Sequence, residues 1–148
     1  MSELSPTKPD EVVWILERLD VLRSHDDTVS KLREDFSRGI ISDEFFRDKL
    51  LDANEKLDQA IARAEQEHTA TTGRPSIREE LGFTCIRQSG SHMIFHHLDG
   101  RWTTVPIHKG RDLGKGILRK ILKDARISVH EFEKLRHYKI EVEQQLFK

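Results

Sequence analysis

Four of the eight histidines lie in one short stretch of the chain: His92, His96, His97 and His108. Histidine titrates near neutral pH and is therefore the usual general acid or base at cellular pH. Apolar and polar residues alternate around them, which is typical of β-strands. Leu98-Asp-Gly100 predicts a hairpin turn between two of these strands. His92 and His96 share one strand face but lie about 13 Å apart, too far to serve one phosphate directly.

The register of this hairpin decides which residue stands opposite His92. A two-residue turn places Ile107 there, whereas a three-residue turn places Pro106 there, and the sequence leaves both open. In both registers His108 lies at the same end of the sheet as His92. We therefore interpret His92 and His108 as a candidate catalytic pair, with His108 as the tentative second group.

A zinc site built from these histidines is disfavoured. Their side chains face different sides of the strands, no cysteine pair accompanies them, and their spacing matches no common zinc motif. We expect the protein to use no metal and no other cofactor. For a histidine in a strand, a packing or surface role is the alternative to catalysis.

A glycine-rich segment at residues 110–116 precedes a predicted helix over residues 115–125. The free N–H groups of that helix could hold a phosphate. The segment is not a Walker loop, because Gly116 follows Lys115 where that motif requires Ser or Thr. Lys115, Arg119, Lys120 and Lys123 recur at helical spacing opposite an apolar side. An RNA-binding face and a merely solvated basic face both fit this pattern.

Three strands are predicted after a linker at residues 69–75, over residues 83–88, 92–97 and 101–107. A short helix over residues 76–81 precedes them. The helix over 115–125 follows, and a capping box at Ser128 and Glu131 opens a last helix that extends to about residue 143. The expected order is α-β-β-β-α-α, with three antiparallel strands and the helices on one face. The fold class is α+β.

The first half of the chain is expected to be helical, with helices over residues 10–23, 28–38 and 42–68. Asp26 and Asp27 interrupt the row of apolar residues along the first helix and predict its end. Gly39 predicts the end of the second helix. The third helix carries apolar residues in alternating steps of four and three, which fits a coiled-coil seam or ordinary packing on the first two helices. They are Phe46, Leu50, Ala53, Leu57, Ala60 and Ala64. Residues 31–51, with Gly39-Ile-Ile-Ser-Asp-Glu-Phe45 at the turn, resemble the SHOCT helical hairpin, a family associated with oligomerisation.

The charge of the 148-residue chain is divided unevenly. Residues 1–72 hold 10 Lys and Arg against 17 Asp and Glu, a charge of −7, whereas residues 73–148 hold 15 against 9, a charge of +6. A basic half indicates a polyanionic partner such as RNA. With a linker at residues 69–75, the pattern predicts an acidic helical segment over 1–70, for oligomerisation or regulation, and a basic RNA-acting domain over 74–148.

The only cysteine, Cys85, excludes an internal disulfide and is typical of a reducing compartment. The first residues lack the basic start and apolar stretch of a signal peptide. No apolar run is long enough to span a bilayer. We expect a cytoplasmic protein without a membrane segment.

Several blocks of residues recur together in the second half of the chain. They are Gly82-Phe83, Arg87-Gln88-x-Gly90-Ser91-His92, Thr104-Val105-Pro106-x-His108, Leu113-Gly114-Lys115-Gly116 and Leu118-Arg119-x-Ile121-Leu122. In order and spacing they resemble the HicA toxin family over residues 74–136. The resemblance implies a double-stranded-RNA-binding-like fold, mRNA cleavage without metal, His92 as the catalytic residue, and an inhibitory HicB-like antitoxin as partner.

Three positions differ from the family pattern. Met93 stands where a second histidine is common, Ile117 replaces the usual Thr after Gly-Lys-Gly, and Pro75 shortens the first helix of the domain. We predict an endoribonuclease, with a non-catalytic RNA-binding module or an oligomeric scaffold as alternatives. The predicted RNA-binding residues are Arg87, Gln88, Ser91, Lys109, Lys115, Arg119 and Lys120.

Overall fold

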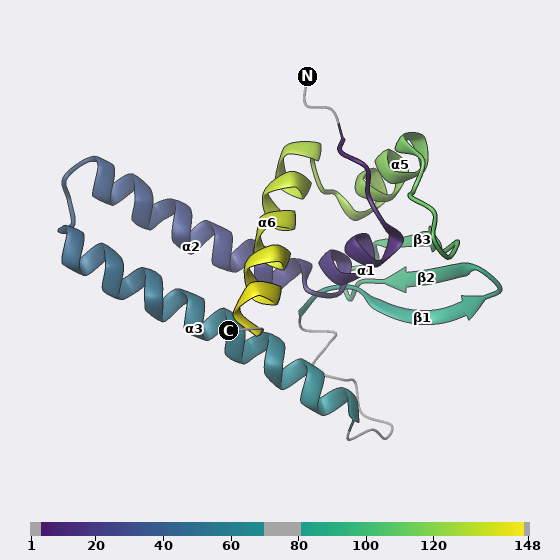
Figure 1. The fold of residues 1–148 in the computed structure, drawn as a ribbon, viewed down its shortest axis with the longest axis horizontal. Coiled ribbons are helices and arrows are strands. Elements are labelled where there is room, and N and C mark those ends of the chain that lie inside the picture. Colours follow the sequence, from purple (N-terminus) through teal and green to yellow (C-terminus); the bar gives the residue numbers. More distant parts are fainter. Residues whose placement is uncertain (1–3, 70–80, 147–148) are drawn as a thin grey trace.

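The computed structural model describes residues 4–69 and 81–146 of the chain. In chain order its elements are α1 (Pro9–Glu17), α2 (Leu19–Ser37), α3 (Asp43–Thr69), β1 (Thr84–Ser89), β2 (His92–His96), β3 (Trp102–Pro106), α5 (Lys115–Ala125) and α6 (Val129–Leu146) (Figure 1). The protein is α+β, as predicted. Residues 70–80, which include the predicted linker except Thr69 and the predicted short helix except Leu81, lie outside the described residues.

The boundary between the first two helices differs from the prediction. The chain breaks at Arg18, with φ −121° and ψ 11°, and not at the aspartates. Asp26 and Asp27 lie inside α2. The carboxylate of Asp26 accepts hydrogen bonds from Lys134 Nζ at 2.9 Å and from the Tyr138 hydroxyl at 3.0 Å. Aspartate disfavours a helix interior when only the local sequence is considered. The partners of Asp26 from α6 therefore compensate its low helix propensity.

Helices α2 and α3 form a hairpin around Gly39, which has φ +74°, and the Ser42 hydroxyl caps α3 by accepting a bond of 3.1 Å from Phe45 N–H. The rings of Phe36 and Phe46 stack with centroids 4.9 Å apart. Of the predicted seam, Ala53 and Leu57 are buried, Phe46, Leu50 and Ala60 are half-buried, and Ala64 lies outside the described side chains. Ile61, which the seam omitted, is buried.

The three strands form one antiparallel sheet in the order β1-β2-β3. His92 pairs with Pro106, and His96 pairs with Trp102. Of the two registers that the sequence left open, the one with a three-residue turn is therefore correct. A β-bulge between Cys85 and Arg87 interrupts the pairing of β1 with β2.

The sheet has one covered face and one open face. Phe95, Thr103 and Val105 point toward the helices and are almost fully buried. Their neighbours along the strands alternate to the opposite face, as the pleat requires. Figure 1 shows α1 and α5 beside the sheet and the α2–α3 hairpin extending away from α5. The prediction of helices on one face of the sheet is confirmed.

The hydrophobic core contains residues from before and after the predicted linker. The buried members from the first part are Leu4, Val12, Ile15, Leu16, Leu19, Leu22, Leu57 and Ile61. The buried members from the second part are Phe83, Phe95, Val105, Leu113, Leu118, Ile121, Leu122, Ala125, Ile127, Phe132 and Leu135. The acidic segment is thus packed, through residues of α1, α2 and α3, into the same core as the sheet.

Polar contacts join α6 to the first helices as well. The Arg23 guanidinium binds the carboxylate of Glu131 and the carbonyl oxygen of Arg126, at the end of α5. Arg136 donates to the carboxylate of Glu11 at 2.8 Å. The predicted cap of α6 is present, because Glu131 N–H donates to the Ser128 hydroxyl at 3.0 Å.

Candidate active site and nucleic-acid interface

His92 is the first residue of β2 and is exposed. It pairs with Ser89 on one side and with Pro106 on the other, at the end of the sheet next to the β1–β2 turn. Paired residues in an antiparallel sheet share a face. His92 therefore lies on the open face, opposite to the face that Phe95 and Val105 bury. An exposed imidazole at this position is accessible to a large substrate.

His108 lies just beyond the end of β3. The strand pairing continues for one more step, because Ile107 N–H donates to the Ser91 carbonyl at 2.6 Å, and His108 is the next residue. Its carbonyl accepts from Arg111 N–H at 3.0 Å in a turn that contains Gly110, with φ +78°. His108 is exposed and lies at the same end of the sheet as His92.

The other two histidines of the stretch have different surroundings. His96 is exposed and lies on the open face, two side-chain positions from His92. His97 is only 8% exposed. Its Nε2 lies 2.7 Å from a carboxylate oxygen of Asp20, and its Nδ1 accepts from Asp99 N–H at 3.0 Å. His97 therefore connects α2 to the β2–β3 turn, a packing role that the sequence alone did not distinguish from chemistry.

The β2–β3 turn is held by charged side chains. Arg101 donates its backbone N–H to Asp99 Oδ1 at 3.0 Å and its Nε to Asp99 Oδ2 at 2.8 Å. These contacts, the backbone hydrogen bond first, hold the pKa of Asp99 below its usual value. The Arg101 guanidinium also covers the Phe83 ring at 5.2 Å and donates to the Ala125 carbonyl. The turn is consequently attached to both the start of β1 and the end of α5.

The glycine-rich segment contains Gly114, the N-cap of α5, and no side chain caps this helix. The first turn contains Lys115, Gly116 and Ile117, all of which are exposed. Leu113, just before it, is 9% exposed, and its N–H donates to the Thr7 carbonyl at 2.8 Å. The segment before α1 thus fixes the start of α5, a contact that nothing in the sequence pattern indicated.

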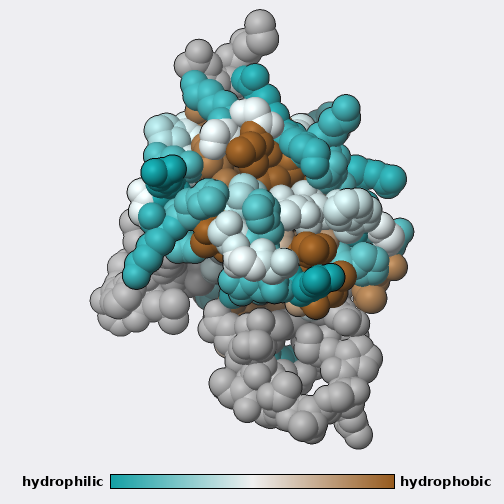
Figure 2. Space-filling model, turned by 90° about the vertical axis from the view of Figure 1, so that its right-hand side faces the viewer, coloured by the Kyte–Doolittle hydropathy of each residue, from teal (hydrophilic) through white to brown (hydrophobic). Residues whose placement is uncertain are grey.

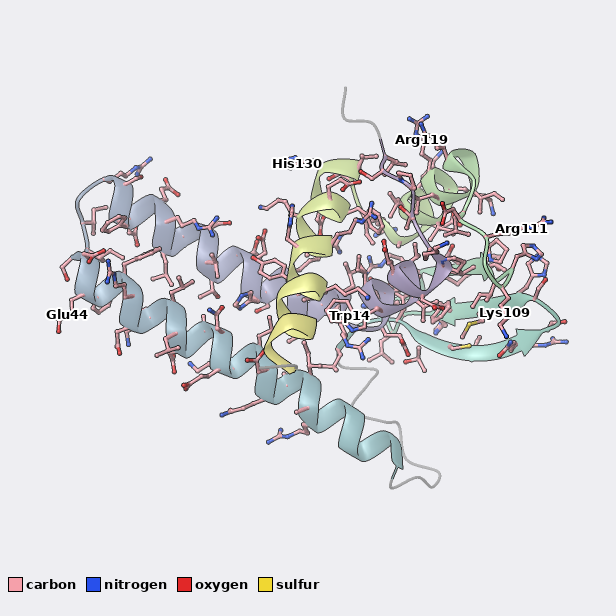
Figure 3. The ribbon with its side chains drawn as sticks, viewed as in Figure 1. Trp14, Glu44, Lys109, Arg111, Arg119 and His130 are labelled. Carbon is pink, nitrogen blue, oxygen red and sulfur yellow. The ribbon has the colours of Figure 1, made fainter. Side chains whose placement is uncertain are left out.

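The basic side of α5 faces away from the sheet. Leu118, Ile121, Leu122 and Ala125 are buried in the core, while Arg119 and Lys120 are exposed on the other side of the helix. Since α5 packs on the covered face, its basic residues and His92 lie on opposite sides of the sheet. Lys109 and Arg111 project at the end of the molecule that connects the two sides (Figure 3).

The predicted RNA-binding residues consequently fall into three groups. Arg87 pairs with Ile94 on the open face. Gln88, Ser91 and Lys109 lie at the turn end of the sheet, where Figure 2 shows hydrophilic side chains around areas of apolar surface. Lys115, Arg119 and Lys120 belong to α5. A bound strand would have to pass around the end of the sheet to touch all three groups.

Metal-binding clusters and membrane-spanning helices are both absent from the part of the chain that the structure describes. Within residues 4–69 and 81–146, no group of three His, Cys, Asp or Glu residues is arranged to hold a metal ion. No helix over the same residues is both long and apolar enough to cross a bilayer.

The architecture, a three-stranded antiparallel sheet with helices on one face, is consistent with the predicted double-stranded-RNA-binding-like fold. Residues 76–127 match the family model of the HicA toxin of bacterial toxin–antitoxin systems. No curated protein matches the chain. The part of the chain that contains β1, β2, β3 and α5 is therefore similar to the HicA toxin family, whereas the helices before residue 76 lie outside the match.

Proposed function

We propose that this protein is an endoribonuclease, the mRNA-cleaving toxin of a type II toxin–antitoxin system. The observation that carries the proposal is the exposed His92 on the open face of a HicA-type sheet. A general acid or base must reach its substrate, and His92 meets this requirement, whereas the buried His97 does not.

In this mechanism the ribose 2′-oxygen attacks the adjacent phosphorus as the bond from phosphorus to the 5′-oxygen breaks. His92 removes the 2′-OH proton or protonates the departing 5′-oxygen. One histidine cannot efficiently do both in one turnover, so His108, a lysine or water supplies the second proton transfer. Lys109 would hold the flanking phosphate. Positioned proton transfer contributes about 10²–10⁴ in rate.

This chemistry requires no metal, since the histidines move the protons and the basic side chains carry the charge of the phosphate. The HicA-type domain further supports a HicB-like antitoxin as the physiological partner, acting in the cytoplasm.

The test is incubation of purified protein with RNA in EDTA. We expect cleavage by the wild type, none by His92→Ala, and partial loss in His108→Ala. Because both histidines are exposed, their replacement should leave thermal unfolding nearly unchanged. His130→Ala, an exposed histidine at the start of α6, is the matched control and should cleave normally. Cleavage by His92→Ala at the wild-type rate would refute the assignment.

A second candidate is an RNA-binding module without activity. Met93 is half-buried at the position where a second histidine is common in the family, and Ile117 replaces a hydroxyl residue at the exposed start of α5. RNA binding without cleavage in the same assay would favour this function. Neither binding nor cleavage would favour a scaffold protein.

A further inference from the structure

Trp102 is the most conspicuous side chain of the open face. It begins β3, is 63% exposed, and pairs with His96 on β2. The remaining positions of the open face on β2 and β3 are His92, Ile94, Thr104 and Pro106. Large apolar side chains gathered on an otherwise polar surface usually mark a binding site.

Strand β1 adds positive charge to this face through Arg87. The β-bulge leaves Ile86 and Arg87 both exposed, opposite Ile94, and Ile86 is 62% exposed. None of the three described strands contains an aspartate or glutamate. An exposed aromatic ring paired with an imidazole, and a guanidinium on the far strand of the same face, suit a ligand that is both aromatic and anionic. RNA with unpaired bases has this chemistry.

The position of His92 on this face also fits RNA with unpaired bases as the ligand. His92 and His96 lie on one strand face about 13 Å apart, so a single RNA strand lying along β2 can contact Trp102 and His92 together. The basic side of α5 lies across the sheet from His92, so it can hold only RNA that continues around the end of the sheet and not the base beside His96. Bases in a duplex are stacked on each other and are recognised mainly by shape and backbone contacts.

We propose that the open face of the sheet is a platform for single-stranded RNA, on which an unpaired base stacks against Trp102. His96, which pairs with Trp102, lies next to the stacked base, and Arg87, on the far strand of the same face, holds a neighbouring phosphate. The inference rests on RNA being the substrate of the proposed function. It adds that the protein selects unpaired nucleotides, and it names Trp102 as a binding residue that the HicA-like motifs do not contain.

Tryptophan fluorescence tests the platform directly, because the chain has only two tryptophans. Trp14 is half-buried in α1, where the Arg18 guanidinium covers its ring at 4.8 Å. The full-length Trp14→Phe variant therefore reports on Trp102 alone. The probe is a short 2′-O-methyl oligoribonucleotide, which lacks the 2′-OH nucleophile and cannot be cleaved. Stacking should quench the fluorescence as the oligonucleotide binds.

Substitution measures the contribution of the ring. In the otherwise wild-type protein, Trp102→Ala should weaken binding of the oligonucleotide roughly 5- to 150-fold, and Trp102→Phe should weaken it less. The matched control is Leu98→Ala, which truncates a side chain that is 65% exposed in the neighbouring turn. It should leave binding unchanged. Thermal unfolding of Trp102→Ala should stay close to that of the wild type, because the side chain is exposed.

Each result bears on either the platform or the nuclease. Binding that leaves Trp102 fluorescence unchanged overturns the platform, even if cleavage depends on His92. Equal quenching by a duplex of the same oligonucleotide overturns the selection of unpaired bases. Quenching that rises with protein concentration without RNA overturns the RNA ligand in favour of a second copy of the chain. Quenching by single strands in a protein that never cleaves supports the platform and refutes the nuclease.

Discussion

The carbonyl oxygen of Leu16, in α1, accepts a hydrogen bond of 2.7 Å from the N–H of Phe83, which immediately precedes β1. This bond joins two residues on opposite sides of the predicted linker. A Cβ atom at Gly82 would lie 2.5 Å from the same carbonyl oxygen and 2.7 Å from the Leu19 nitrogen. The Gly82-Phe83 pair of the HicA-like pattern thus lies directly against the junction of α1 and α2.

Gly82→Ala should destabilise the protein by about 1–3 kcal/mol, because the added methyl group meets backbone atoms that cannot move away freely. Gly116→Ala is the matched control, since a Cβ there meets nothing within 4 Å and alanine favours the helix. Urea unfolding followed by circular dichroism gives both free energies. Equal stability of Gly82→Ala and the wild type would show that α1 does not pack here.

A fragment of residues 73–148 should not fold alone. It lacks Val12, Ile15, Leu16, Leu19 and Leu22, which are all buried in the shared core. Burial contributes about 1.5–3 kcal/mol for each such side chain, so the loss approaches the total stability of about 5–15 kcal/mol of a typical domain. Circular dichroism and thermal unfolding test this expectation. A cooperative transition of the fragment near that of the full chain would contradict it.

Shortening the hairpin is the matched alternative to this truncation. Deleting residues 30–36 from α2 and 46–52 from α3 removes roughly two turns from each helix and keeps α1 in place. We expect the shortened protein to fold and to cleave RNA. A smaller particle by light scattering would assign oligomerisation to the outer hairpin, whereas stronger cleavage would assign restraint. An unfolded product would show that the outer hairpin supports the core.

Replacement of Lys115, Arg119 and Lys120 by glutamine should weaken binding of all RNA sequences similarly, because phosphate contacts carry no sequence information. The slope of log affinity against log salt should flatten by roughly 0.7–0.9 for each phosphate that the variant no longer neutralises. The control removes the same charge from Lys31, Arg33 and Lys49 on the hairpin. An unchanged slope in the first variant would mean that RNA stays on the open face and never reaches α5.

The lowered pKa of Asp99 predicts a pH dependence of stability. A carboxyl group whose pKa is lower in the folded state stabilises that state above its unfolded pKa, and this contribution disappears as the pH falls through the folded value. We therefore expect wild-type thermal stability to decline below about pH 4 with a component that Asp99→Asn lacks. Asp48→Asn, on exposed α3, serves as the control. Identical pH profiles for all three proteins would contradict the prediction.

Local patterns were sufficient to predict several elements. The bounds of α5 agree with the predicted residues 115–125, and the Ser128 cap begins α6 as expected. The strands were found within one or two residues, because the period of two along the chain reports directly on a sheet with one buried face. The grouping of His92 and His108 at one end of the sheet also follows from hairpin geometry in either register.

The sequence by itself thus determined the α+β class, the sheet, the caps and the choice of His92 as a candidate, since each depends on neighbours in the chain. Only the tertiary structure decided the register, the break at Arg18, the burial of His97 against Asp20 and the packing of α1 against Gly82. These features depend on interactions between residues tens of positions apart, such as Asp26 with Tyr138. No local period records such interactions, because the free energy that selects them comes from burial and pairing across the whole fold.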